Sequence, residues 1–132
     1  MATRKKATTV RKTAADLPKV ADYTILINCM YPCTPCDALA KKAITRAFKA
    51  WAAEAGYSVV YSDDNKTTGY WKRYGKPNKV LQATPQVYVV GAKQKCSGVC
   101  IGEGATVGDY VIPPYDQWDA KMLRAVCEEL GI

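Results

Sequence analysis

Six cysteines are the residues of this 132-residue chain with the clearest capacity for chemistry. Two of them belong to the Cys-x-x-Cys sequence Cys33-Thr34-Pro35-Cys36. Thiols at this spacing can cycle between a dithiol and a disulfide, or supply two ligands to a metal ion. The other four are Cys29, Cys96, Cys100 and Cys127.

The chain has no histidine, which excludes several common catalytic centres. Ser-His-Asp and Cys-His pairs, zinc fingers with histidine ligands and the HExxH metalloprotease helix all require an imidazole group. Any acid or thiol chemistry must therefore use other side chains.

The segments on either side of the Cys-x-x-Cys motif place it where a strand turns into a helix. Residues 23–28 form a short apolar run that is typical of a strand buried on both faces. Residues 39–55 carry apolar side chains at spacings of three to five, which predicts an amphipathic helix ending near Gly56. Cys33 then lies at or just before the first turn, and Pro35 falls where a helix tolerates proline.

This position favours Cys33 as the reactive thiol. Unpaired backbone N–H groups and the helix dipole stabilise a thiolate, and so lower a cysteine pKa from its usual value of about 8.5. Cys36, one turn further on, can close a disulfide. We therefore expect Cys33 to be the more exposed and more acidic thiol of the pair.

The remaining segments continue the alternation of strand and helix. Residues 57–62 predict a second strand, and residues 63–65 can cap a short helix over 67–74 that ends at 75–77. Residues 86–90 predict a third strand, followed by a hairpin loop at 91–95.

A last helix is expected to begin at Asp116 and to stop at Gly131. The resulting order is βαβαββα. Such an order predicts an α/β domain over residues 21–132, with a mixed four-stranded sheet flanked by helices on both faces.

Together with Thr84-Pro85 before the third strand, this order resembles the thioredoxin superfamily, and glutaredoxin most closely, over about residues 21–131. The resemblance implies that Pro85 follows a cis peptide bond beside the disulfide. It implies Cys33 as the attacking thiol and Cys36 as the resolving thiol. It also implies substrate binding along Thr34, Pro35, Thr84 and Pro85.

Two features of the sequence favour glutaredoxin over thioredoxin as the more similar family. Ile27 stands where thioredoxins place a buried acid, and only the basic tail precedes the first predicted strand, so both favour glutaredoxin. Glutathione is a candidate electron donor. The Gly-Gly-Asp segment of the family's glutathione site is matched only in part, at residues 102–104 and 108–109.

The other cysteines have simpler interpretations. Cys29 is expected to be a small buried side chain, or else a disulfide partner for Cys33, and Cys127 belongs to the apolar face of the last helix. For Cys96 and Cys100 a local disulfide is favoured over two inert thiols. Zinc bound by these two with the Cys-x-x-Cys pair ranks last, because the spacing fits a zinc site poorly, and no metal is predicted.

The net charge of +7 is concentrated at the N-terminus. Residues 1–19 carry six basic residues and one acidic residue, so the rest of the chain contributes only +2. We expect residues 1–20 to be a flexible basic arm. It either serves only solubility or lies on phosphates of a nucleic acid or on an acidic protein surface.

Aromatic and basic residues lie close together in and just after the second predicted helix. Tyr70, Trp71 and Tyr74 stand among four basic residues. They could stack on single-stranded nucleic acid, but an amphipathic helix with basic side chains at its edges explains them more simply. The four basic residues are Lys72, Arg73, Lys76 and Lys79.

The leading functional hypothesis is a small dithiol–disulfide oxidoreductase that reduces disulfides of protein or small-molecule substrates. The competing hypothesis is a non-enzymatic thioredoxin-fold assembly module, anchored by its basic arm within a virus particle or a nucleoprotein complex. Neither a secretion signal nor a span of about 18 apolar residues is visible, so we expect no membrane partner. The expected location is the cytoplasm or an intracellularly assembled particle, not secretion.

Overall fold

A computed structural model of the chain describes residues 17–63 and 69–132. The predicted basic arm falls largely on residues 1–16, outside the described residues. The predicted start of the second helix, with two of its three capping residues, likewise falls on residues 64–68, outside the described residues.

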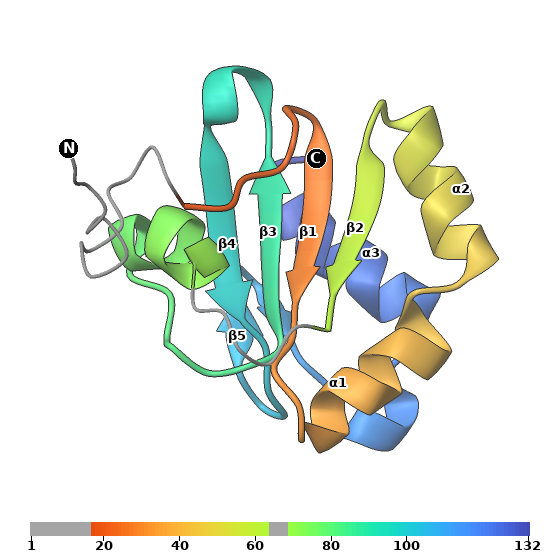
Figure 1. Ribbon diagram of the computed structural model, residues 1–132. Helices are drawn as coiled ribbons and strands as arrows, with labels where there is room; N and C mark the ends of the chain where they lie inside the picture. The colour runs from red at the N-terminus through yellow and green to blue at the C-terminus, as the bar shows by residue number, and fades with distance from the viewer. Residues whose placement is uncertain (1–16, 64–68) are drawn as a thin grey trace, which may run out of the picture.

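Four strands form the central sheet of the described chain, in the order β2-β1-β3-β4 (Figure 1). β1 pairs parallel to β2, and both β1–β3 and β3–β4 are antiparallel. The predicted mixed four-stranded α/β sheet is therefore confirmed. The strands are β1 (Thr24–Asn28), β2 (Ser58–Ser62), β3 (Gln86–Val90) and β4 (Cys96–Cys100).

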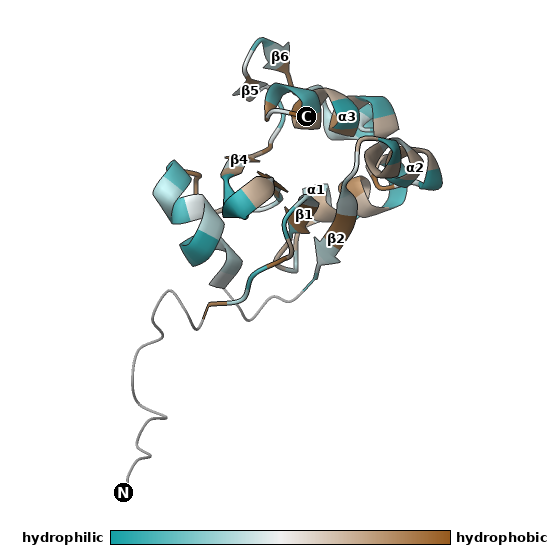
Figure 2. Ribbon diagram, turned by 90° about the horizontal axis from the view of Figure 1, so that it is seen from above, coloured by the Kyte–Doolittle hydropathy of each residue, from teal (hydrophilic) through white to brown (hydrophobic). Residues whose placement is uncertain are grey.

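The central strands β1 and β3 are buried along their whole length, because both faces of the sheet are covered. On β1, Ile25 and Ile27 join the core on one face, and Leu26 joins a second core on the other. Figure 2 shows the helices α2 (Arg46–Glu54) and α3 (Ala120–Glu129) on one side of the sheet and residues 71–78 on the other. The alternation of side chains along a strand thus feeds two separate cores.

The long helix expected after the Cys-x-x-Cys motif is interrupted. It consists of α1 (Thr34–Ala38), the π-helical segment η3 (Leu39–Ala43) and α2 (Arg46–Glu54). Ile44 leaves the helical conformation, and the hydroxyl of Thr45 accepts the N–H of Phe48 at 3.3 Å as an N-cap. A threonine side chain competes for backbone hydrogen bonds, and this restarts the helix where the apolar pattern alone predicts continuity.

The second helical region lies on the opposite face of the sheet. It comprises η4 (Trp71–Gly75), a π-helical segment, and η5 (Lys76–Asn78), a 3-10 turn. It continues past the end expected at residues 75–77 because Pro77 occupies the first turn of η5, where its missing N–H costs nothing. The chain leaves the turn at Lys79, whose φ is 58°.

The aromatic side chains of this region serve the second core. The indole N–H of Trp71 donates to the carbonyl of Val80 at 2.8 Å. Tyr74 is buried, and its hydroxyl accepts the N–H of Val20 at 3.0 Å and donates to Gln94 at 2.8 Å. These interactions favour the amphipathic-helix interpretation over a stacking surface for bases.

The last helix begins later than expected. It is α3 (Ala120–Glu129), and Asp119 caps it by accepting the N–H of Met122 at 2.9 Å. Asp116 lies instead in the 3-10 turn η7 (Tyr115–Gln117). Between turn and helix, Trp118 is extended and buried, and its indole N–H donates to Pro113, so its packing overrides the helical pattern.

A two-stranded hairpin of β5 (Thr106–Val107) and β6 (Tyr110–Val111) precedes this turn. Among the described residues, no helix is both long and apolar enough to cross a membrane.

Gly98 of β4 provides a test of the second core. It pairs with Tyr88, and a Cβ atom at this position would lie 2.3 Å from the buried ring of Tyr88. We expect Gly98→Ala to lower the free energy of unfolding by about 2–3 kcal/mol, because a tightly packed ring must move. The measurement is urea denaturation.

Gly102→Ala is the matched control, since nothing lies within 4 Å of its added Cβ. Its effect should stay within about 0.5 kcal/mol. Equal stability of the two variants would contradict the packing described for this face.

Candidate redox site

Cys33 and Cys36 are joined by a disulfide at the junction of the β1 loop and α1. Their Cα atoms are 5.2 Å apart. Cys33 is the N-cap of α1, with extended backbone, and its Sγ accepts the backbone N–H of Cys36 at 3.2 Å. Pro35 occupies the first turn, as the sequence predicted.

The two sulfur positions differ in their exposure. Cys33 is partly exposed, whereas Cys36 is completely buried. Thr34 is exposed beside Cys33. An external disulfide therefore has access to Cys33 only, which is the asymmetry expected from the sequence.

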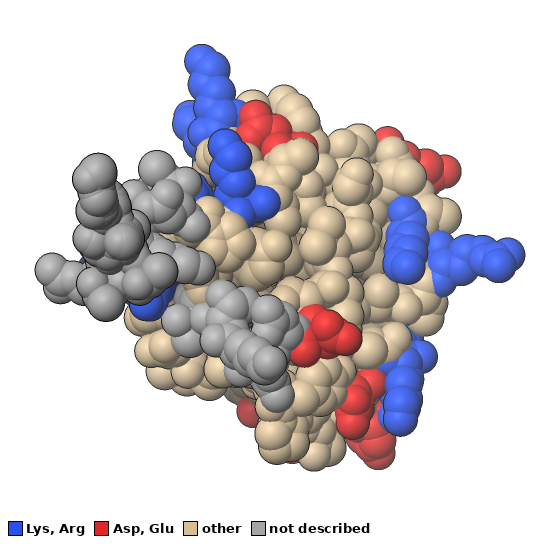
Figure 3. Space-filling model, in the orientation of Figure 1, with Lys and Arg blue, Asp and Glu red and all other residues tan. Residues whose placement is uncertain are grey.

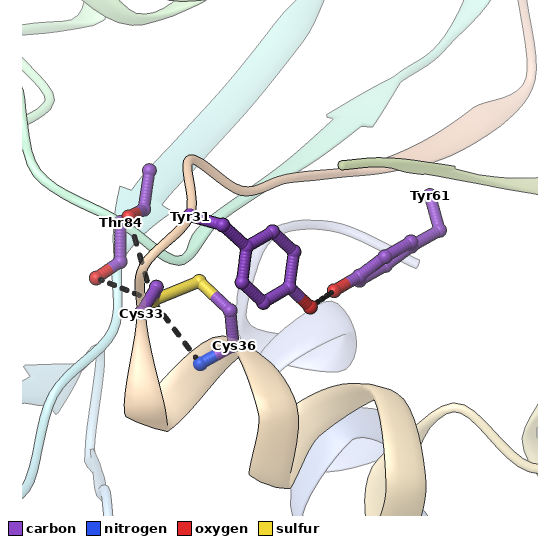
Figure 4. The surroundings of a disulfide bond; sticks show 5 residues. All are labelled: Tyr31, Cys33, Cys36, Tyr61 and Thr84. Atoms are coloured by element: carbon purple, nitrogen blue, oxygen red, sulfur yellow. Dashed lines mark hydrogen bonds between the residues drawn. A yellow bond between two sulfur atoms is a disulfide. The ribbon is translucent and has the colours of Figure 1, made fainter. Parts of the chain in front are cut away.

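Thr84 lies against Cys33 although 51 residues separate them (Figure 4). Its hydroxyl donates to Cys33 Sγ at 3.5 Å, and its carbonyl oxygen lies 3.8 Å from the same sulfur. The Thr84–Pro85 peptide bond is cis, and Pro85 is buried. The structure thus brings together the two motifs that the sequence analysis singled out.

The loop from Leu81 to Ala83, which leads to Thr84, is exposed. Leu81 shows 70% of its surface to solvent. β3 begins at Gln86, so Thr84 lies outside the strand pairing of the sheet. An accessible stretch of backbone therefore borders the sulfur of Cys33.

Two tyrosines near the disulfide were missed by the sequence analysis. Tyr31 precedes the motif, its ring lies beside the disulfide, and its hydroxyl is hydrogen bonded to that of Tyr61 at the end of β2 (Figure 4). A signal was available, because the carboxyl ends of the parallel strands β1 and β2 must lie at the same edge of the sheet. The tyrosine pair ties the Cys-x-x-Cys loop to its neighbouring strand.

Cys29 lies at the base of this loop and is a buried free thiol, not a disulfide partner of Cys33. Burial raises its pKa to about 11, opposed in part by its hydrogen bond to Tyr61. Burial also raises the pKa of Tyr61, and its hydrogen bonds to Tyr31 and Cys29 add to the effect. Burial raises the pKa of Tyr31 as well, so the thiol of Cys29 and both tyrosine hydroxyls are neutral at physiological pH.

The disulfide expected between Cys96 and Cys100 is wrong, since both are free cysteines. They stand at the two ends of β4, and four residue steps along a strand span about 13 Å, beyond the roughly 7 Å limit for a disulfide. Both pack on the second core, on the face of the sheet away from α2 and α3. Burial raises the pKa of Cys96 to about 12 and also raises that of Cys100.

Cys127 is buried on α3 within the first core, as predicted. Burial raises its pKa to about 12. Within residues 17–63 and 69–132, no group of three or more Cys, Asp or Glu side chains is placed to hold a metal ion.

The two glycine-containing segments at residues 102–104 and 108–109 lie before the small hairpin and at its turn. Gly102 and Gly104 follow β4, and Gly108 and Asp109 form the β5–β6 turn. The N–H of Asp109 donates to the carboxylate of Glu129 at 3.2 Å. This turn is therefore bonded to the end of α3.

Comparison with protein-family models, with curated proteins and with solved structures finds no match to this chain. The interpretation of the site therefore depends on the residues and contacts described above.

The contrast between Cys33 and the other thiols can be measured by alkylation of the reduced protein at pH 8. We expect Cys33 to react first, because Cys36 is completely buried and burial raises the pKa of the four other thiols. A thiol of pKa about 12 is ionised in about one molecule in 10⁴ at this pH, and unfolding should speed its labelling by about three orders of magnitude. Mass spectrometry of peptides gives the order, and preferential labelling of Cys96 in the folded protein would contradict it.

The hydroxyl of Thr84 offers a second test. Thr84→Val removes the donor to Cys33 Sγ at nearly constant shape. Because a hydrogen bond to a charged group contributes roughly 1.5 kcal/mol, alkylation of reduced Cys33 at pH 6 should slow by about tenfold. Thr84→Ser, which keeps the hydroxyl, should react at nearly the wild-type rate, and equal slowing in both variants would show that the methyl packing matters instead.

Proposed function

We propose that this protein is a small dithiol–disulfide oxidoreductase with a thioredoxin-like fold, most similar to glutaredoxin. The observation that carries the proposal is the pairing of an accessible Cys33 with a buried Cys36 in one disulfide. An exchange reaction needs one sulfur that a substrate can reach and a second that only the first can reach.

The order of elements supports the thioredoxin-like part of the proposal. The parallel β1–β2 pair is connected through α1 and α2, and the β3–β4 hairpin and α3 follow. The contact of Thr84 with Cys33 supports it further, because the resemblance implies such a wall beside the attacking thiol.

The proposed reaction begins with the reduced protein. The thiolate of Cys33 attacks one sulfur of a substrate disulfide, the substrate S–S bond breaks, and the other substrate sulfur leaves as a thiolate that takes a proton from solvent. The N–H of Cys36 and the hydroxyl of Thr84 are placed to stabilise the charge on Cys33.

Cys36 then completes the exchange. Its thiolate attacks Cys33, the mixed disulfide breaks, and the second substrate sulfur leaves. Two electrons have passed to the substrate, and the Cys33–Cys36 disulfide has formed, which is the state seen here. A dithiol reductase or two molecules of glutathione must then reduce it for another cycle.

A disulfide-exchange assay on a disulfide-bonded peptide tests this proposal, with glutathione and a dithiol reductase compared as donors. Cys33→Ser should lose all turnover above the protein-free rate, because no attacking thiol remains. Cys36→Ser should accumulate a mixed disulfide with the peptide, visible as an added mass. Cys96→Ser should keep wild-type turnover, since Cys96 packs on the other face of the sheet.

Turnover in the Cys33→Ser variant would overturn the proposal. So would a Cys33–Cys36 disulfide that stays oxidised with both donors, and this result would favour the non-enzymatic assembly module. One tightly held zinc ion per chain with no reducible disulfide would favour a structural metal site instead.

A further inference from the structure

Charges are unevenly distributed between the two consecutive segments 69–102 and 103–132. Residues 69–102 carry six basic residues and no acidic one, whereas residues 103–132 carry six acidic and two basic residues. The first range forms η4 and η5, on one side of the sheet, together with the sheet strands β3 and β4, and the second includes α3 on the other side (Figure 2).

Five lysines of residues 69–102 are exposed. Lys72 lies in η4, Lys76 begins η5, and Lys79 is the residue at which the chain leaves this turn, so all three belong to the same short helical region. The other two stand at the tip of the β3–β4 hairpin, around the turn η6 (Ala92–Gln94). In Figure 3 basic side chains project from the hairpin at the top of the molecule. These two are Lys93 and Lys95.

The chain just before β1 holds these two groups of lysines together. Arg73 donates to the carbonyls of Leu17 at 2.7 Å and Pro18 at 2.9 Å. Gln94 donates to the carbonyl of Val20 at 3.0 Å, and Val20 itself is buried. Residues 17–20 therefore lie between the helical region and the hairpin.

This path adds Lys19, which is exposed, to the same face. Asp22 is the acidic residue beside the hairpin, and its carboxylate accepts three hydrogen bonds from Lys93 and Gln94, the shortest at 2.6 Å.

Six exposed lysines of these segments define a surface that we call the lysine face. They are Lys19, Lys72, Lys76, Lys79, Lys93 and Lys95.

We propose that the lysine face binds the phosphate backbone of double-stranded nucleic acid without reading its sequence. Lysines act as point charges on phosphates, and each phosphate neutralised releases counterions from the duplex. A duplex presents about one charge per 1.7 Å of its axis, the densest regular array of phosphates that such a face can meet.

The packing of the aromatic residues favours a duplex over a single strand or a lipid surface. Tyr74 is buried, Trp71 is bonded to Val80, and Tyr70 stacks on Tyr74 at 6.4 Å between ring centroids. Single-strand binding draws on exposed rings for base stacking, and a membrane-surface helix inserts an apolar side into lipid. The lysine face carries positive charge but neither fully exposed rings for base stacking nor an apolar helix side for insertion into lipid.

The face is separate from the redox site. The hairpin lies at the opposite end of the sheet from α1, where Cys33 and Cys36 are joined (Figure 1). Binding should therefore not depend on the disulfide, and Cys33→Ser should bind the duplex as the wild type does.

Fluorescence anisotropy with a labelled DNA duplex of about 20 base pairs tests the proposal, using the full chain at salt concentrations from about 50 to about 200 mM. Replacing Lys72, Lys76 and Lys79 by glutamine should lower the slope of log affinity against log salt by about 2.7, because each phosphate contact contributes about 0.9. Over this salt range the three contacts together represent about a 40-fold change in affinity.

The matched control replaces Lys41, Lys49 and Lys121, three exposed lysines of η3, α2 and α3, by glutamine. It has the same net charge as the first variant, and its salt slope should stay within about 0.5 of the wild type. If the first variant is shown by circular dichroism to be unfolded, Lys93→Gln with Lys95→Gln replaces it, with an expected decrease of about 1.8.

Four results would overturn the proposal: no binding to the duplex, equal slopes in the two triple variants, tighter binding to a single strand of the same length, or binding only to phosphatidylserine vesicles. Loss of disulfide exchange in Cys33→Ser with unchanged duplex binding would support both proposals. Loss of duplex binding alone would leave the proposed redox function standing.

Discussion

The burial of β1 on both faces is the constraint on which the rest of the structure depends. Ile25, Leu26 and Ile27 are fully buried, yet alternate residues of a strand point to opposite sides of the sheet. Two separate layers must therefore cover the strand. One is built from α1, α2 and α3, and the other from residues 69–80 with the chain that precedes β1.

The position of the Cys33–Cys36 disulfide follows from where this strand ends. The chain leaves β1 at Asn28, and Cys33 is reached after a short loop whose Tyr31 is bonded to Tyr61 of the neighbouring strand. β3 runs antiparallel to β1, so its first residues lie at the same edge and bring Thr84 to the sulfur of Cys33. The sulfur of Cys33 at the helix start thus accepts hydrogen bonds from the nearby N–H of Cys36 and from the hydroxyl of Thr84, 51 residues further along the chain.

The second layer shows how one helical region can serve packing and charge together. The ring of Tyr74 packs against Tyr88 and its hydroxyl bonds to Val20, while the lysines of the region remain exposed to water. Because Arg73 and Gln94 bind backbone carbonyls of residues 17–20, the chain is fixed between helix and hairpin.

By itself, the sequence determined the features that depend on local pattern. The apolar run of β1, the placement of Cys33 before a helix with Pro35 in its first turn, the β3–β4 hairpin and the mixed sheet all follow from periodicity, turn residues and connection rules. The motifs at Cys33 and Thr84 were visible as residues. Their contact followed only from a resemblance.

Tertiary structure decided where helices begin and end, which cysteines pair and which distant segments come into contact. The break at Thr45 and the late start of α3 at Asp119 reflect caps and a buried Trp118 that a helical pattern does not reveal. Cys96 and Cys100 are four residues apart and look close in sequence, but an extended strand separates them by about 13 Å and leaves both thiols free. The segments that carry Lys19, Lys72 and Lys93 are brought together because the side chains of Arg73 and Gln94 donate to the backbone carbonyls of Leu17 and Val20, more than 50 residues away in the chain, and sequence patterns carry no signal for such contacts.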